Sequence, residues 1–195
     1  MSTKDYLLDV ISRFRVVLDA HIRQLVCFDQ YAIQVEGWLK GEIVQFFDSE
    51  KLATTLDEFE TEVKCGYGRK RVDCFLKLQG TPVWVELKHW QIGSQGDQRW
   101  IASDYFVSKS FGIYGDADKL SKIIDGDRYI LILATKNPDY EEQGDWGKGV
   151  DRFNQNFNPL HIKSYTNPSN FPRFYFLGLL EVTANAQRKS PQVRR

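Results

Sequence analysis

Apolar residues near the N-terminus recur at steps of three and four. Between Lys4 and Val26 they are Leu7, Leu8, Ile11, Phe14, Val17, Leu18, Ile22 and Leu25, with His21 on the same face. This spacing predicts one amphipathic helix. A second helical pattern runs from about Tyr31 to Phe47, and its buried stripe is marked by Val35, Leu39 and Phe46.

The pattern changes to a period of two between Glu60 and Trp90. Three segments alternate apolar and polar side chains, ETEVKCG, RVDCFLKL and VWVELKHW, and the residues QGTP separate the last two. Alternation of this kind is typical of strands with one buried face. We therefore expect a three-stranded antiparallel meander.

The rest of the chain predicts further helices and two strands. Helical patterns cover about Asp97 to Phe106 and Asp116 to Ile124, where Asp116 or Asp118 could cap the N-terminus. RYILILAT is apolar on both faces, as in the centre of a covered sheet, and RFYFLGLLEV predicts a late strand. NPDYEEQGDWGKG, rich in Gly and acidic residues, is expected to be an exposed loop. The order indicates an α/β fold with a central mixed sheet flanked by helices.

Length and charge refine this picture. We expect a single domain over residues 1–185 and a basic, disordered tail over residues 186–195. Lys plus Arg and Asp plus Glu number 26 each, so the molecule has no net charge to draw it onto nucleic acid. Any basic surface must be local.

The cysteines indicate a reducing compartment. Cys27, Cys65 and Cys74 form no CxxC pair, which argues against a disulfide framework and a structural zinc site. The N-terminus lacks the apolar run of a signal peptide, and no segment approaches the ~20 apolar residues of a membrane span. We expect a soluble, cytoplasmic protein.

The hairpin within the meander gathers polar residues at one end. With the turn centred between Gly80 and Thr81, Asp73 lies opposite Lys88 and Phe75 opposite Glu86. One face is then wholly apolar: Val72, Cys74, Leu76, Leu78, Val83, Val85 and Leu87. The other face carries Asp73, Glu86 and Lys88 at the end away from the turn.

These groups suit metal-dependent hydrolysis of a phosphodiester. Asp73 and Glu86 are hard oxygen ligands for Mg²⁺ or Mn²⁺, and the backbone carbonyl of Leu87 can add a third oxygen. A bound divalent cation activates water and neutralises charge on phosphate oxygens. Lys88 would then lie beside the attacking water.

Two simpler interpretations stay open. Asp73 and Lys88 can form a cross-strand ion pair on a solvated face, worth only about 0.2–1 kcal/mol. Arg69, Lys70 and Arg71 lead into Asp73 and either contact phosphate or form an ordinary solvated charge run.

Asp73, twelve intervening residues and then Glu86-Leu87-Lys88 resemble the motif of the PD-(D/E)XK nuclease superfamily, whose members have a restriction-endonuclease-like fold. The resemblance covers about Gln34 to Thr135, although Val72 stands where the family has Pro before the Asp. It implies an N-terminal helix, a meander, a helix and a central strand. It also implies a Mg²⁺-dependent endonuclease that acts on nucleic acid, with DNA as the substrate.

The same resemblance implies a further glutamate from the N-terminal helix. Glu36 and Glu42 compete for this role, and about 120° separates them around the helix, so both cannot face one site. Glu36 has Lys40 one turn on for a surface ion pair, whereas Glu42 interrupts the apolar stripe. We favour Glu42 as the additional metal ligand.

The sequence therefore predicts a nuclease with Asp73, Glu86, Lys88 and Glu42 in the catalytic site. Because no separate recognition domain is apparent, we expect a homodimer or a targeting partner. The alternative is a catalytically inactive nuclease-fold module that binds nucleic acid or serves in assembly.

Overall fold

The structure is a computed structural model that describes residues 1–31, 33–65, 70–95, 98–107, 112–136, 145–156, 162–165 and 174–184. Its helices are α1 (Thr3–Ala20), α2 (Ile22–Gln30), α3 (Glu36–Leu52), α4 (Asp104–Val107), α5 (Tyr114–Ser121) and α6 (Asp145–Asn156). Its strands are β1 (Glu58–Lys64), β2 (Arg71–Leu78), β3 (Thr81–Gln95), β4 (Gln98–Trp100), β5 (Asp127–Lys136), β6 (Ile162–Ser164) and β7 (Tyr175–Val182). The predicted tail at 186–195 lies outside the described residues.

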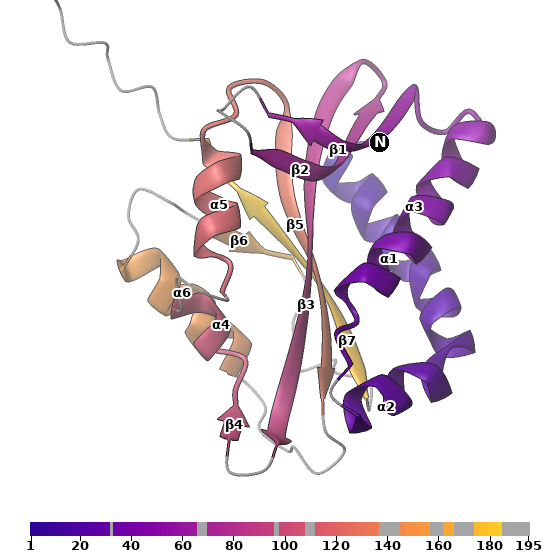
Figure 1. Cartoon of the computed structure of the whole chain (residues 1–195). Coiled ribbons are helices and arrows are strands. Elements are labelled where there is room, and N and C mark those ends of the chain that lie inside the picture. Colours follow the sequence, from indigo (N-terminus) through magenta and orange to yellow (C-terminus); the bar gives the residue numbers. More distant parts are fainter. Residues whose placement is uncertain are drawn as a thin grey trace, which may run out of the picture.

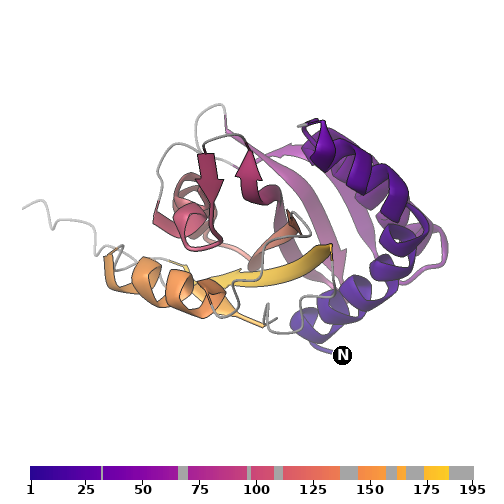
Figure 2. The ribbon, with the colours of Figure 1, turned by 90° about the horizontal axis from the view of Figure 1, so that it is seen from below.

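One mixed sheet runs through the middle of the fold. Its strands follow the order β1-β2-β3-β5-β7-β6, and β4 pairs with β3. Helices α1, α2 and α3 lie on one side of the sheet and α4, α5 and α6 on the other (Figures 1 and 2). The expected α/β architecture, a central mixed sheet flanked by helices, is confirmed.

The central strand is β5, as its two apolar faces predict. It pairs in parallel with β3 and antiparallel with β7. Residues 130–134 of β5 are all buried, since helices cover both of its faces.

The predicted N-terminal helix is divided in two. His21 has φ −102° and ψ 13°, outside helical geometry, and its N–H bonds to the carbonyls of Val17 and Leu18. The chain changes direction there, and Leu25 of α2 is buried in the same core as α1. Apolar spacing continues through His21 in the sequence, so it does not reveal the break.

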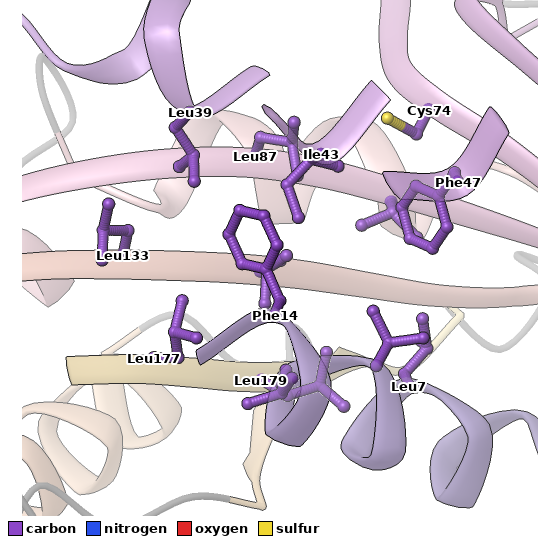
Figure 3. Close-up of a cluster of buried hydrophobic side chains, with 14 of the residues drawn as sticks. Leu7, Phe14, Leu39, Ile43, Phe47, Cys74, Leu87, Leu133, Leu177 and Leu179 are labelled. Atoms are coloured by element: carbon purple, nitrogen blue, oxygen red, sulfur yellow. The ribbon is translucent and has the colours of Figure 1, made fainter. Parts of the chain in front are cut away.

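The boundaries and rotation of α3 also differ from expectation. Its buried residues follow Val35 at steps of four, Leu39, Ile43 and Phe47, while Phe46 is only half-buried. Figure 3 shows Leu39 and Ile43 directed toward the sheet, in the same cluster of buried side chains as Leu87. These contacts orient the helix over β3.

Two other local predictions are wrong. Residues 145–149, expected in a loop, begin α6, because Trp146, Val150 and Phe153 form a buried helical stripe. The segment from Asp97 to Phe106 contains the short β4 and α4 in place of one helix. Residues 137–144, the rest of the predicted loop, lie outside the residues that the structure describes.

The N-terminus of α5 differs as well. Ile113 occupies the N-cap position without a side-chain hydrogen bond, so neither Asp116 nor Asp118 caps this helix. Both residues lie within the helix instead, which leaves their carboxylates available for contacts with other elements.

The β2–β3 hairpin has a tighter turn than expected. Gln79 and Gly80 have φ of 50° and 78°, which is typical of a two-residue type I′ turn. Leu78 therefore pairs with Thr81, and continuing this register puts Asp73 opposite Glu86, not Lys88. A two-residue shift preserves the alternation of faces, and all seven residues of the predicted apolar face are buried, but Val72 is buried in a different core from the other six, contrary to the prediction.

Two apolar cores flank the sheet. One lies under α1, α2 and α3, and the other lies under α4, α5 and α6. Val72 belongs to the second core, while the other six residues of the predicted apolar face belong to the first. Among the described residues, no helix has both the length and the apolar character needed to cross a membrane.

Candidate functional site

Asp73 lies in the gap where β2 separates from β3. Its Oδ2 accepts a hydrogen bond from the Leu87 N–H at 3.0 Å, and its Oδ1 lies 3.0 Å from the Lys40 ammonium of α3. Burial acts to raise the pKa of Asp73, but the Leu87 N–H and the Lys40 ammonium outweigh it and hold that pKa below its ordinary value. Asp73 is therefore an ionised carboxylate fixed between two strands.

Glu86 lies beside Asp73 on the surface of β3 that faces α5. It is only 4% exposed, and the Lys119 ammonium of α5 contacts its Oε1 as an ion pair. This ammonium is therefore the partner of the buried oxygen, although the contact does not have the angles of a regular hydrogen bond. Burial, with the negative charge of Asp73 adding to it, raises the pKa of Glu86 to about 8.

Lys88 points toward α5 as well. Its ammonium lies 3.0 Å from Asp116 Oδ2, so it pairs with the helix and not with Asp73 as the simpler interpretation supposed. Burial acts to lower the pKa of Lys88, but the charge of Asp116 outweighs it and raises that pKa. Lys88 remains a cation two residues from Glu86.

Helix α5 contributes two site residues that the sequence analysis did not identify. Asp116 and Lys119 are three positions apart on one helical face, and their ammonium and carboxylate groups lie 3.7 Å apart. Lys119 also donates to the carbonyl of Arg71 at 2.9 Å. The spacing of three residues between Asp116 and Lys119 could have identified this pair, but the sequence pattern was interpreted as placing Asp116 at a helix cap.

A cavity of about 410 Å³ opens on the other side of Asp73, beneath the N-terminal end of α3. Its lining includes Gln34, Val35, Glu36, Gly37, Lys40, Asp73, Leu87 and His89. The Lys40 ammonium, which pairs with Asp73, also contacts Glu62 of β1. Asp73 is therefore accessible from the side of the sheet that α3 covers.

Glu36, not Glu42, belongs to this cavity. Glu36 lies one helical turn before Lys40, the residue that contacts Asp73. Glu42 is half-buried, does not line the cavity and lies about 160° from Lys40 around the helix. The sequence preference for Glu42 assumed Phe46 in the buried stripe, and the stripe passes through Ile43 and Phe47 instead.

His89 points away from Lys88, as strand alternation predicts, and lines the cavity. Its Nε2 lies 3.0 Å from Thr135 Oγ1 of β5. Burial lowers the pKa of His89 to about 4, so the imidazole is neutral at pH 7.

The basic run before Asp73 is partly described. Lys70 and Arg71 are exposed at the start of β2, and the Arg71 guanidinium donates to the Glu62 carbonyl at 2.7 Å. Arg69 lies outside the described residues. Lys70 and Arg71 thus remain accessible to a ligand that approaches this end of the sheet.

The residues around Asp73 fit a hydrated divalent cation. The described residues contain no group of three His, Cys, Asp or Glu side chains arranged for a metal. The donor set is therefore the two carboxylates and the Leu87 carbonyl, which points toward β2 on the same strand edge as the Leu87 N–H that bonds Asp73. Mg²⁺ commonly takes one or two carboxylates and keeps several waters, and a cation at Glu86 Oε1 would replace the Lys119 ammonium that contacts this oxygen.

Comparison of the chain with protein-family models, with curated proteins and with solved structures finds no match.

Proposed function

We propose that this protein is a divalent-metal-dependent nuclease whose cation is held by Asp73, Glu86 and the Leu87 carbonyl. The observation that carries the proposal is the pairing of two adjacent carboxylates, one fixed between strands by the Leu87 N–H and one buried with the Lys119 ammonium on its Oε1. Buried carboxylates need a compensating cation, and the Lys40 and Lys119 ammonium groups mark the positions where a divalent cation would compensate these two. Phosphodiester cleavage is the chemistry that best uses one here.

The order of the elements supports this proposal. Helix α3 precedes the meander of β1, β2 and β3, and α5 then leads into the central strand β5. This is the order that the resemblance to the PD-(D/E)XK superfamily implies. The motif residues Asp73, Glu86 and Lys88 lie on the two middle strands of that arrangement.

Each residue has a separate task in the proposed reaction. Asp73 and Glu86 bind the cation, which when bound would polarise a water and a phosphate oxygen. Lys88 holds the attacking water or stabilises negative charge on phosphate, and Asp116 keeps the Lys88 ammonium in place at 3.0 Å. Glu36 lines the cavity on the opposite side of Asp73 and can orient further water.

The substrate is nucleic acid, and DNA is favoured by the resemblance alone. Lys70 and Arg71 are placed to contact phosphate at the end of β2, and Arg69 remains a predicted contact. The lack of net charge favours a homodimer or a targeting partner that supplies additional binding surface. All three cysteines are free thiols, which agrees with the proposed cytoplasmic location.

A second function has one observation in its favour. Asp73 is paired with Lys40, and Glu86 is paired with Lys119. In a nuclease-fold module without catalysis, these two lysines would stay paired with the carboxylates and no metal would replace them. Such a module would bind nucleic acid through its exposed cations.

Cleavage assays separate the two functions. Plasmid, single-stranded DNA and RNA are incubated with the protein and Mg²⁺ or Mn²⁺, and products are resolved on gels. We expect metal-dependent cutting that Lys88→Ala reduces by about 100-fold or more. The matched control is Lys77→Ala, which removes an ammonium that pairs with Glu58 on β1, far along β2 from Asp73. Equal activity of the two variants, or binding without metal-dependent cutting, would favour the inactive module.

A further inference from the structure

Lys119 reaches from α5 into the buried centre of the site. Its side chain is 13% exposed, and its ammonium contacts Glu86 Oε1. The same ammonium donates to the Arg71 carbonyl at 2.9 Å and lies 3.7 Å from Asp116 Oδ1. A lysine held by three acceptors from two strands and a helix is not an ordinary surface residue.

Positive and negative side chains alternate in the contacts between α5 and β3. Glu86 contacts Lys119, Lys119 faces Asp116, and Asp116 pairs with Lys88. With all four groups ionised, this set has no net charge. A divalent cation at Glu86 would add two positive charges next to the Lys119 ammonium.

We propose that Lys119 is an internal counter-ion of Glu86 that competes with the divalent cation, so that this lysine sets the cation affinity of the site. The inference rests on the proposed metal-dependent function. Its basis is geometric, because the Lys119 ammonium occupies the buried carboxylate oxygen that a cation ligated by Glu86 would use.

Coulomb repulsion gives the direction of the effect. If the cation binds ionised Glu86, the local charge rises by two, and if it replaces a proton on Glu86, the charge rises by one. Either change is opposed by the positive charge of the Lys119 ammonium, which lies next to Glu86 in a poorly solvated site. Removing the Lys119 charge should therefore strengthen cation binding in both cases.

The displaced ammonium has other partners within reach. The Arg71 carbonyl already accepts from it, and Asp116 lies on the same helical face. A Lys119 ammonium that moves toward Asp116 would share this carboxylate with Lys88. Cation binding at Glu86 would thereby weaken the hold of Asp116 on Lys88, the residue proposed to act on water.

The test is equilibrium binding of Mn²⁺ to the full chain by isothermal titration calorimetry. We compare wild type with Lys119→Met, which removes the charge and keeps a long side chain. The matched control is Lys122→Met on the same helix, whose ammonium pairs with Asp118. We expect Lys119→Met to bind Mn²⁺ about tenfold more tightly, an effect comparable to that of other residues behind a metal ligand. Lys122→Met should stay within about twofold of wild type.

A second measurement on the wild-type protein does not depend on how Lys119→Met folds. Limited acetylation is followed at each lysine by mass spectrometry, with and without Mn²⁺. We expect Mn²⁺ to increase the labelling rate at Lys119 and to leave the rate at Lys122 unchanged. An unchanged rate at Lys119 despite Mn²⁺ binding would overturn the inference.

The outcomes distinguish this inference from the proposed function. If wild type and Lys119→Met bind Mn²⁺ equally, the metal site stands and the role of Lys119 is refuted. If Lys119→Met binds Mn²⁺ and wild type does not, the competition is supported. If neither protein binds Mn²⁺, both the inference and the proposed metal site are contradicted.

Discussion

The Leu87 N–H donates a hydrogen bond to Asp73 Oδ2 across 3.0 Å, in the gap where β2 separates from β3. The carboxylate thus replaces the backbone carbonyl that would accept this hydrogen bond between two regularly paired strands. This bond keeps the Asp73 side chain against the sheet. Its neighbour in the hairpin register is Glu86, which is buried. Two acidic groups are held together by the backbone itself, and the stability of this arrangement should depend on protons or cations.

The pH dependence of the free energy of unfolding should show the raised pKa of Glu86. Burial, with the charge of Asp73 adding to it, raises its pKa from 4.5 to about 8. Between these values the folded protein retains a proton that the unfolded chain releases, so stability falls as pH rises through this window and the contribution is lost above about pH 8. Lys119 and Asp116 of α5 and Lys88 of β3 also face this group.

Glu86→Gln should therefore stabilise the protein at pH 9 by about 1–3 kcal/mol, the usual cost of a buried group without full partners. At pH 4.5 the variant and wild type should differ little. Urea denaturation followed by circular dichroism at several pH values measures this difference. Glu60→Gln, on the exposed side of β1, is the control, and parallel pH profiles for Glu86→Gln and wild type would contradict the prediction.

The two helix glutamates should differ in their effect on cation binding. Glu36 lines the cavity with Asp73, whereas Glu42 does not. We expect Glu36→Gln to weaken Mn²⁺ binding by about tenfold, as is common for groups around a metal site, and Glu42→Gln to leave it unchanged. Calorimetric titrations of both variants provide the comparison, and a loss confined to Glu42→Gln would show that α3 is rotated differently in solution.

Gly126 should be required for the close approach of the chain to β3. It has φ of 80°, and a Cβ atom at this position would lie 2.3 Å from the Pro82 carbonyl oxygen. Gly126→Ala should therefore destabilise the protein by at least about 1–3 kcal/mol. Gly115→Ala in α5 is the control, because its Cβ would meet nothing within 4 Å. Denaturation midpoints measure both effects, and equal midpoints would refute this packing.

Much of the sheet could be predicted because its signals are local. Strand β2 follows the alternating segment RVDCFLKL, and β5 follows the apolar segment RYILILAT. The hairpin register was off by two residues because Gln79 adopts a positive φ that its residue type does not signal. Strand faces repeat every two residues, so the error left Glu86 and Lys88 together on one side, facing α5, while Asp73 lines the cavity beneath α3.

The partners of the site residues could not be predicted in the same way. Lys40 reaches Asp73, and Lys119 reaches Glu86, through packing of helices that lie far away in the chain. The choice between Glu36 and Glu42 depended on the rotation of α3, which Ile43 and Phe47 fix by packing on the sheet. Local periodicity gave too little information to settle that rotation.

The most direct measurement of the central claim is Mn²⁺ binding to wild type and to Asp73→Asn, titrated by calorimetry at pH 8. Asparagine keeps the size of the side chain and removes the charge that Asp73 would contribute to the cation. We predict saturable binding to wild type and a loss of affinity of about tenfold or more in a folded Asp73→Asn variant. Absence of binding to wild type, or the same affinity in both proteins, would contradict a metal site built on Asp73 and Glu86.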